Sequence, residues 1–330
     1  MDLSVPLSLT DTPRRPSPRI AVLIPCWNEA VTIGKVVADF RAALPCATVY
    51  VYDNNSTDGT IAAARAAGAV TRHERLQGKG NVIRRAFADV EADIYVLVDG
   101  DDTYDAAAAR DMVRLLAEQG LDMVTGRRQT DLGDAYRTGH RLGNRVLTGL
   151  VQFVFGNRVS DMLSGYRVFS RRFVKSFPAL AAGFETETEF TVHALELQMP
   201  VGEVATAYGV RPAGSASKLR TYADGLRILR TIAMLVKDQR PLQFFGLSGV
   251  VLLLLATGLG LPIVMEFLQT GLVPRLPTAL LATGLVLLSF LSFSVGLILE
   301  SVARGRKELK RMSYLAIPAF AADGLEATPD

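Results

Sequence analysis

Two aspartates separated by one residue, Asp99 and Asp101, follow a short apolar run. The run, residues 94–98, is typical of a buried strand, so both carboxylates are expected at the edge of a sheet. Hard cations such as Mg²⁺ and Mn²⁺ prefer oxygen ligands, and often take few of them from the protein and the rest from water and substrate phosphates. The spacing therefore favours a metal that holds a nucleotide diphosphate.

A helix start is the alternative for the same stretch. Asp102 or Thr103 could cap the helical segment predicted at 106–118. Capping accounts for one acid and leaves Asp99 and Asp101 crowded without a role. We therefore expect the metal to bind Asp99 and Asp101, and Asp102 to cap the helix.

Further residues suited to ligand binding follow the two preceding predicted strands, at Pro25, Asn28, Glu29 and Asp53. A carboxylate at such a position, like that of Asp53, can accept hydrogen bonds from a base or a ribose hydroxyl. Asp58 stands just before the next predicted helix, and capping and ligand binding are both open for it.

The segment Gly78-Lys79-Gly80 opens another predicted helix. Backbone N–H groups at a helix N-terminus with a cation beside them suit a phosphate. The segment does not have the spacing of a Walker loop, and no GxGxxG follows the first strand, so the sequence carries neither of these nucleotide-binding fingerprints.

Alternating strands and helices must position these residues. Strands are expected at 20–24, 49–52, 94–98, 123–125, 166–170 and 201–210, and helices at 33–40, 62–67, 78–90, 106–118, 142–154 and 184–198. A loop is expected at 127–139. This alternation predicts an α/β fold with a mostly parallel, doubly wound sheet, whose ligands bind beyond the carboxyl ends of the strands. Pro25, Asp53 and Asp99 all fall at such ends.

Two later stretches, 242–265 and 276–299, contain no charged residue. At ~1.5 Å rise per residue, each is long enough to cross a hydrocarbon core of about 30 Å. Buried core helices are the alternative, but a short connector at 266–275 favours a transmembrane hairpin. Basic residues flank the outer ends of the two stretches, and the connector holds only Arg275. The positive-inside rule therefore predicts that the large domain and both termini are cytoplasmic.

The segment 218–240 repeats apolar residues at helical spacing among basic ones. Such a helix next to a membrane span is expected to lie in the headgroup layer, although packing on its own domain is the alternative. The predicted organisation is a disordered tail at 1–18, a catalytic domain at 19–213, a juxtamembrane helix at 214–241, the hairpin at 242–303 and a basic, then flexible tail at 304–330. The N-terminus does not have the pattern of a signal peptide.

Composition adds limits on partners. The formal net charge of +3 is too small to indicate nucleic acid. One pair of cysteines, Cys26 and Cys46, makes no disulfide framework, and both are expected to be reduced. The sequence leaves a homo-oligomer open.

Taken together, the motifs resemble the family 2 glycosyltransferases of the GT-A fold. The matching segments are 24–29 (Ile-Pro-Cys-Trp-Asn-Glu), 53–60, 78–80 and 99–101. Segments 161–167 (Asp-Met-Leu-Ser-Gly-Tyr-Arg) and 184–189 are similar to later motifs of the polyprenyl-phosphate branch, which includes dolichyl-phosphate mannose synthase. The resemblance covers about residues 20–240. Where that branch usually has Gln two places after its second aspartate, this chain has Thr103.

The resemblance implies a role for each matching residue. Asp53 would bind the base, and Asp99 and Asp101 the Mg²⁺ or Mn²⁺ that holds the diphosphate. The donor nucleotide-sugar would contact Pro25, Asn28, Glu29, Asp58, Lys79, Ser164 and Glu187. Catalytic roles extend to Arg127, Arg141 and Arg167, and the cations for a lipid phosphate are Arg128, Arg141, Arg211 and Lys218.

The implied reaction is inverting transfer of a sugar from a nucleotide-sugar, UDP before GDP, to polyprenyl (undecaprenyl-type) phosphate at the bacterial inner membrane. A lipid monophosphate is largely a dianion at neutral pH, because its second pKa is about 6, so no general base is needed. A GDP-mannose-dependent mannose synthase and an inactive membrane-anchored scaffold remain alternatives. The sequence argues against a processive polysaccharide synthase, because the Gln-x-x-Arg-Trp motif of that family is absent and the only tryptophan is Trp27.

Overall fold

The computed structural model describes residues 17–129, 160–183, 185–212, 230, 233–234 and 237–319. Arg141, Lys218 and the predicted helix at 142–154 lie outside these ranges, as does most of the predicted juxtamembrane helix. Within that segment, the described residues 230, 233–234 and 237–239 are helical. The predictions for the rest of it stay predictions.

A seven-stranded sheet forms the centre of the domain, in the order β3-β2-β1-β4-β6-β5-β7. Neighbouring strands are parallel except at β6, which is antiparallel to both β4 and β5. The strands are β1 (Ile20–Cys26), β2 (Thr48–Asp53), β3 (Val70–His73), β4 (Ile94–Leu97), β5 (Met123–Gln129), β6 (Arg167–Ser170) and β7 (Val201–Ala207).

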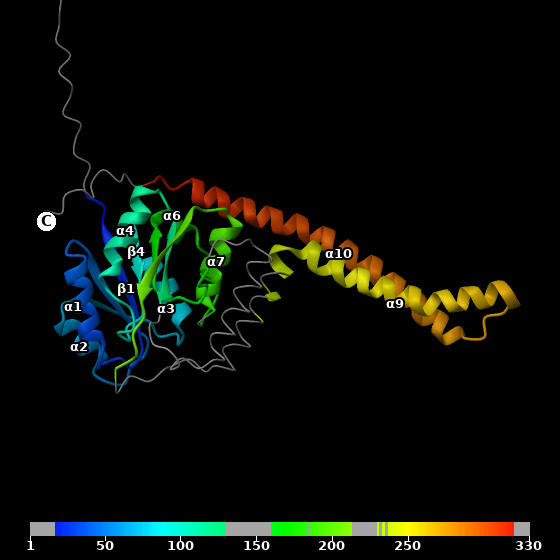
Figure 1. The fold of residues 1–330 in the computed structure, drawn as a ribbon, viewed down its shortest axis with the longest axis horizontal. Helices are drawn as coiled ribbons and strands as arrows, with labels where there is room; N and C mark the ends of the chain where they lie inside the picture. Colours follow the sequence, from blue (N-terminus) through cyan, green and yellow to red (C-terminus); the bar gives the residue numbers. More distant parts are fainter. Residues whose placement is uncertain are drawn as a thin grey trace, which may run out of the picture.

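Helices cover both faces of the sheet (Figure 1). One core contains residues of α1 (Ile33–Ala43), α2 (Thr60–Ala66) and α4 (Ala108–Glu118). The other contains residues of α3 (Lys79–Asp89), α6 (Arg171–Ser176) and α7 (Thr186–Glu196). Because both faces are covered, β1 and β4 are apolar on both sides, and successive residues of β1 enter opposite cores. The predicted mostly parallel α/β sheet is confirmed.

Two elements were not predicted from the sequence. Strand β3 has only four residues, of which two are charged or titratable, and its burial is weak because it lies at the edge of the sheet. Helix α6 is also short, and Ser170 caps it by accepting a hydrogen bond from the backbone N–H of Phe173. Arg127 and Arg128, expected in a loop, instead continue β5, because β7 pairs with that strand as far as Gln129.

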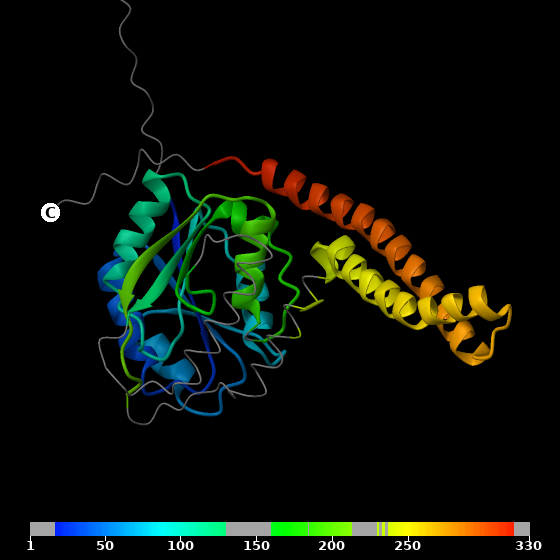
Figure 2. The same cartoon turned by 45° about the vertical axis from the view of Figure 1, so that its right-hand side comes forward.

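The C-terminal helices α9 (Pro241–Thr270) and α10 (Leu276–Leu315) pack against each other and extend away from the sheet (Figures 1 and 2). Both are long and apolar enough to cross a membrane, and only 17% of each most apolar window is buried. A helix in the core of a soluble protein would be mostly buried. Serine side chains of α10 form hydrogen bonds to the backbone of α9. Ser289 Oγ donates to the carbonyl of Gly249, and Ser292 Oγ donates to the carbonyl of Phe245, each at 2.8 Å.

Helix α10 does not end where the hairpin was expected to end, at residue 303. It continues to Leu315, so the basic first part of the expected tail is helical. Residues 304–315 contain no proline, and Pro318 comes only after the helix end. The added turns pack on the α/β domain, where Tyr314 joins the core between α6 and α7.

Candidate active site

The strand register brings the predicted polar residues to one edge of the sheet. Cys26 of β1 pairs with Asp53 of β2, and Leu23 pairs with Leu97, two residues before Asp99. The carboxyl ends of β2, β1 and β4 therefore lie side by side. Asp53 and the Asp99–Asp101 pair share this edge, as predicted for ligand binding in open α/β sheets.

Asp99 is held by a buried lysine. Lys79 Nζ lies 2.5 Å from Asp99 Oδ1 and 2.6 Å from Glu187 Oε1. Burial lowers the pKa of Lys79, but the charges of Asp99 and Glu187 outweigh it and raise the pKa above its ordinary value. The lysine at the start of α3 is thus a fixed cation between a strand end and the first turn of α7.

Asp101 is more deeply buried and is held by two groups. Thr103 Oγ1 donates a hydrogen bond of 2.6 Å to Oδ1, and Arg211 forms an ion pair with Oδ2. Burial and then the charge of Asp99 raise the pKa of Asp101. Arg211 also lies 3.8 Å from Glu29. The arginine expected at a lipid phosphate therefore lies at the predicted metal site.

A turn carrying Ser164 and Gly165 covers Asp99. Ser164 Oγ donates to the carbonyl of Gly126 at 2.6 Å, and the N–H of Gly165 donates to Tyr104 Oη at 3.0 Å. A Cβ on Gly165 would overlap the Asp99 carboxylate and approach Lys79 Nζ at 3.1 Å. Only glycine fits at this point, while the Ser164 side chain faces the backbone of β5.

Arg167, expected to be catalytic, begins β6 opposite Leu97, but it is fully buried. Its guanidinium donates to the carbonyls of Ser164 and Met162 and to Thr191 Oγ1. Burial lowers its pKa to about 10. The structure thus corrects the prediction: Arg167 lies between β6 and α7 and holds the 162–164 turn in place.

Arg127 and Arg128 differ in their surroundings. Arg128 makes two hydrogen bonds of 2.8 Å to the buried Asp161, and its guanidinium lies 5.5 Å from the centre of the Tyr208 ring. The expected lipid-phosphate cation is therefore already engaged in an internal ion pair. Arg127 is exposed at the end of β5, where a phosphate could reach it.

The opposite end of the site has an unsatisfied carboxylate. Asp53 is 1% exposed, and its Oδ2 accepts from the N–H of Ser56 at 3.2 Å and lies 3.2 Å from His73 Nδ1. Its Oδ1 is buried with no hydrogen-bond partner among the described residues. An orphaned buried carboxylate oxygen needs a donor, and a nucleotide base or ribose could supply one.

Hydrogen bonds within residues 28–60 hold the loops beside Asp53 in place. Asn28 has a positive φ of 53°, and its Oδ1 accepts from the N–H of Thr57 at 2.8 Å. Glu29 is buried, and its N–H donates to Thr60 Oγ1 at 2.9 Å. Asp58 accepts from the N–H groups of Ala30 and Thr60, so it supports the loop and the start of α2.

Asp102 is not the helix cap that was predicted. It has a positive φ of 57° and pairs with Lys35 at 2.7 Å, while α4 begins only at Ala108. The N–H of Ala107 donates instead to Asp105 Oδ1 at 2.9 Å. Asp102 therefore belongs to an exposed ion pair with α1, one residue away from the buried Asp101.

The donor set fits a divalent cation that is only partly coordinated by protein. Asp99 and Asp101 offer carboxylate oxygens, and the cations Lys79 and Arg211 balance them. No group of three or more His, Cys, Asp or Glu residues suited to a metal occurs within the described ranges. A metal held by Asp99 and Asp101 would therefore complete its shell with diphosphate oxygens and water, as Mg²⁺ commonly does.

Three contributors to the site were not predicted: His73 beside Asp53, Tyr104 beneath Gly165, and the pairing of Arg211 with Asp101. His73 ends an unpredicted strand. A strand prediction at 70–73 would have placed His73 at the same edge as Asp53. The other two contacts join distant segments, and local patterns carry no signal for them.

Comparison with known proteins places the chain in a family. The sequence profile of "Glycosyl transferase family 2" matches residues 21–177. An uncharacterized Shigella flexneri protein is 55% identical over 155 residues, covering 47% of this chain and 95% of that protein. The Haloferax volcanii "Glycosyltransferase AglJ" is 36% identical over 250 residues, covering 75% of this chain and 81% of the relative.

Two further similarities concern a lipid-linked relative and a solved structure. A Haloferax volcanii protein named "Dolichyl-phosphate hexose transferase" is 26% identical over 221 residues, covering 67% of this chain and 95% of that protein. The structure of Mycobacterium tuberculosis glucosyl-3-phosphoglycerate synthase, in complex with Mn²⁺, UDP-glucose and phosphoglyceric acid, aligns with a TM-score of 0.53 and 23% identity, covering 65% of this chain and 78% of that one. The structural likeness supports the GT-A fold. With the profile match and the AglJ alignment, it follows that the chain is a glycosyltransferase and belongs to glycosyl transferase family 2.

Proposed function

We propose that this enzyme transfers a sugar from a nucleotide-sugar, with UDP as the favoured nucleotide, to a polyprenyl phosphate in the membrane. One observation carries the proposal: the acidic edge that suits a nucleotide diphosphate belongs to the same chain as two membrane-length helices, one of which packs on the catalytic domain. A sugar acceptor embedded in the bilayer is the natural substrate for such an arrangement.

The donor side rests on three neighbouring groups. The orphaned Oδ1 of Asp53 would accept a hydrogen bond from the base or ribose. Asp99 and Asp101 would hold Mg²⁺ or Mn²⁺, which when bound would neutralise the charge of the leaving diphosphate. Lys79, already fixed beside Asp99, would add a positive charge next to the phosphates. The bound Mn²⁺ and UDP-glucose of the mycobacterial synthase support this assignment by analogy of fold.

The acceptor side rests on the helices and on one relative. The dolichyl-phosphate hexose transferase is aligned over 95% of its length, which supports a lipid phosphate as acceptor. Exposed Arg127 and the predicted Arg141 and Lys218 are the cations proposed for that phosphate, and Arg211 would join them when it leaves Asp101. The proposed location is the bacterial inner membrane, with the catalytic domain and both termini in the cytoplasm.

The residues present suit a displacement without a general base. Of the three histidines, His73 lies beside Asp53 and His193 is buried between α6 and α7, so neither is placed to deprotonate an acceptor at Asp99. A phosphate dianion needs no deprotonation before it attacks the anomeric carbon. The protein has to hold the acceptor in line with that carbon, and arginines have to offset the repulsion between two phosphates. A single displacement of this kind inverts the anomeric centre.

A screen of the full-length protein in detergent tests the proposal. UDP- and GDP-sugars would each be incubated with undecaprenyl phosphate and Mn²⁺ or Mg²⁺, and the lipid product identified by mass spectrometry. We expect a sugar–phosphate–lipid from a UDP-sugar and none in the presence of EDTA. Turnover of a water-soluble phosphorylated acceptor, with no lipid product from any donor, would contradict the acceptor assignment.

A further inference from the structure

The end of α10 and the residues just after it contact the α/β domain through several side chains. Lys310 Nζ forms a 2.8 Å ion pair with the buried Glu196, and Arg311 donates to the carbonyl of Leu197. Tyr314 Oη donates to Asp122 Oδ2 at 2.8 Å. Arg172 donates to the carbonyl of Ile317 at 3.0 Å and lies 5.5 Å from the Tyr314 ring centre. We call residues 310–317 with these partners the α10 dock.

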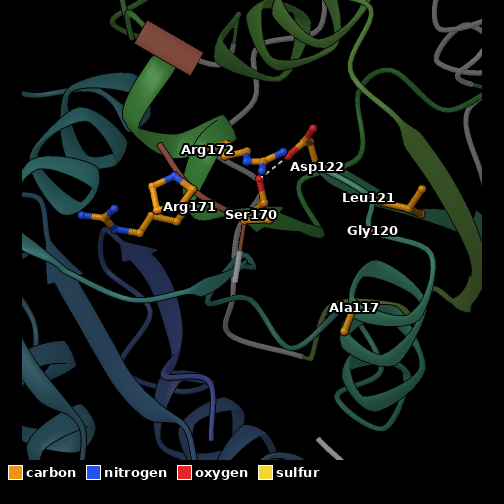
Figure 3. Close-up of a pocket in the computed structure, with 9 residues that line it drawn as sticks. Ala117, Gly120, Leu121, Asp122, Ser170, Arg171 and Arg172 are labelled. Carbon is orange, nitrogen blue, oxygen red and sulfur yellow. Dashed lines mark hydrogen bonds between the residues drawn. The ribbon is translucent and has the colours of Figure 1, made fainter. Parts of the chain in front are cut away.

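The dock lies at the edge of the sheet opposite the active site. Asp122 directly precedes β5, which runs in the same direction as β4, and Ser170 ends the antiparallel β6. Ser170 Oγ donates to Asp122 Oδ1 at 2.6 Å, so the residue that Tyr314 contacts is itself fixed (Figure 3). Asp99, at the carboxyl end of β4, is therefore at the other edge.

The small pocket in Figure 3 lies at the interface of the α10 dock and is not a substrate site. Its lining includes Ala117, Asp122, Ser170 and the two arginines of α6 from the domain, together with Pro318 and Ala319 from the chain after α10. Its volume of about 50 Å³ is far below the ~300–1,000 Å³ of small-molecule sites. The pocket is what remains between the domain and the chain that follows α10.

Helix α10 joins this dock to the apolar hairpin without a break. The apolar stretch ends at Leu299, and Tyr314 lies 15 residues further along one helix. At ~1.5 Å per residue this is about 22 Å. Figure 1 shows α10 running from the hairpin to the region of α6, which it contacts. A single helix anchored at both ends fixes distance and rotation, whereas a linker would fix neither.

We infer that the extension of α10 beyond the membrane is a strut that sets the height and tilt of the catalytic domain above the bilayer. By holding the edge of the sheet remote from Asp99, the strut leaves the carboxyl edge uncovered and keeps it at one orientation toward the lipid acceptor. The inference rests on the proposed membrane anchoring. Lys310, Tyr314 and Glu196 are positioning residues, because none of them contacts the active-site groups described above.

A charge exchange tests the strut. Lys310→Glu and Glu196→Lys each place two like charges at a buried contact, and the double variant restores opposite charges; breaking a buried pair is strongly destabilising to that contact. Met312→Ala is the matched control, because Met312 is on α10 but 67% exposed. Tyr314→Ala removes the ring and the hydroxyl, and Tyr314→Phe keeps the ring but removes the hydrogen bonds of the hydroxyl to Asp122 and Arg172.

Two readouts separate the strut from the proposed function. Trp27, the only tryptophan, is 41% exposed beside the active site, so energy transfer from it to a dansyl-headgroup lipid in phosphatidylglycerol vesicles reports the height of the site. Transfer of sugar to undecaprenyl phosphate reports alignment with the acceptor. Binding of UDP-sugar to the same variants and their thermal unfolding report whether the domain is intact.

Each single charge variant and Tyr314→Ala should shift the energy transfer and lower lipid glycosylation by about tenfold, since small misplacements of reacting groups are costly. Donor binding should stay within about twofold. The double variant and Met312→Ala should match wild type. Wild-type energy transfer in the single variants, or a double variant no better than the singles, would overturn the strut. If no variant, wild type included, made lipid product while the energy transfer still followed this pattern, the strut would stand and the proposed acceptor would be wrong.

Discussion

Lys79 places its ammonium group 2.5 Å from a carboxylate oxygen of Asp99. The lysine is buried, and the same nitrogen also contacts Glu187 in the first turn of α7. Two acids and one cation leave the cluster with a negative charge that a divalent cation would neutralise. The charged groups are therefore in place before substrate arrives. In such a preorganised site, the charges need no reorganisation during the reaction.

Replacing Asp101 should remove metal-dependent turnover, and replacing its neighbour should not. Asp101→Asn keeps the size of the side chain but removes a charged oxygen donor, so we expect at least about a 100-fold loss of sugar transfer with Mn²⁺. Asp102→Asn breaks only the exposed ion pair with Lys35 and should stay within about twofold of wild type. Both are measured as lipid product over time. Wild-type turnover in Asp101→Asn would disprove the metal role.

Gly165→Ala should damage the site by a steric route. The added methyl group would collide with the Asp99 carboxylate, which the ion pair with Lys79 holds in place. We expect turnover to fall by about tenfold or more, because a displacement of this size misaligns a reacting group. Gly209→Ala is the control, since its methyl group would meet only the carbonyl of Thr103 at an ordinary 3.8 Å. Equal rates in the two variants, with both folded, would show that Asp99 can move without loss of function.

His193 should make the domain sensitive to acid. Burial, with a smaller effect of the Lys310 charge, lowers the pKa of His193 from 6.5 to about 3. Between these pH values, His193 binds a proton in the unfolded chain but not in the folded protein. The contribution of His193 to the free energy of unfolding is therefore fully present above pH 6.5 and is lost as the pH falls toward 3. The loss is up to ~1.4 kcal/mol per pH unit.

The measurement is the melting temperature between pH 7 and pH 5, where acid loss should begin. His193→Gln cannot take up the proton and should have a flatter profile than wild type. His73→Gln, at a side chain that is 47% exposed, should keep the wild-type slope. A His193→Gln profile parallel to that of wild type would show that other groups cause the acid sensitivity.

The sequence was sufficient for the sheet and for the position of its acidic edge. Apolar runs such as 20–24 and 94–98 are short, uninterrupted and followed by polar residues, so both the strand and its functional end can be predicted locally. The profile and the fold comparison agree with the predicted family and fold. Strand β3 was missed because an edge strand buries little apolar surface and so leaves a weak pattern.

The directions of side chains were harder to predict. Arg167 belongs to a recognisable motif, yet only the packing of α7 against β6 decides that it points into the core. Arg128 likewise depends on Asp161, 33 residues away. The helical continuation of α10 could have been predicted from the absence of proline before Pro318, whereas its contact with Asp122, 192 residues away, could not.

The position of the α10 dock in the chain also sets an order of assembly. Residues 310–317 follow both apolar stretches, so a ribosome releases them only after the α/β domain and those stretches have been made. Until then, Glu196 is a buried carboxylate without its lysine, and the Asp122 edge is uncovered. The domain therefore completes its packing last, after the second apolar stretch has been made. A nascent chain halted before residue 310 would present that edge to chaperones or to a neighbouring copy.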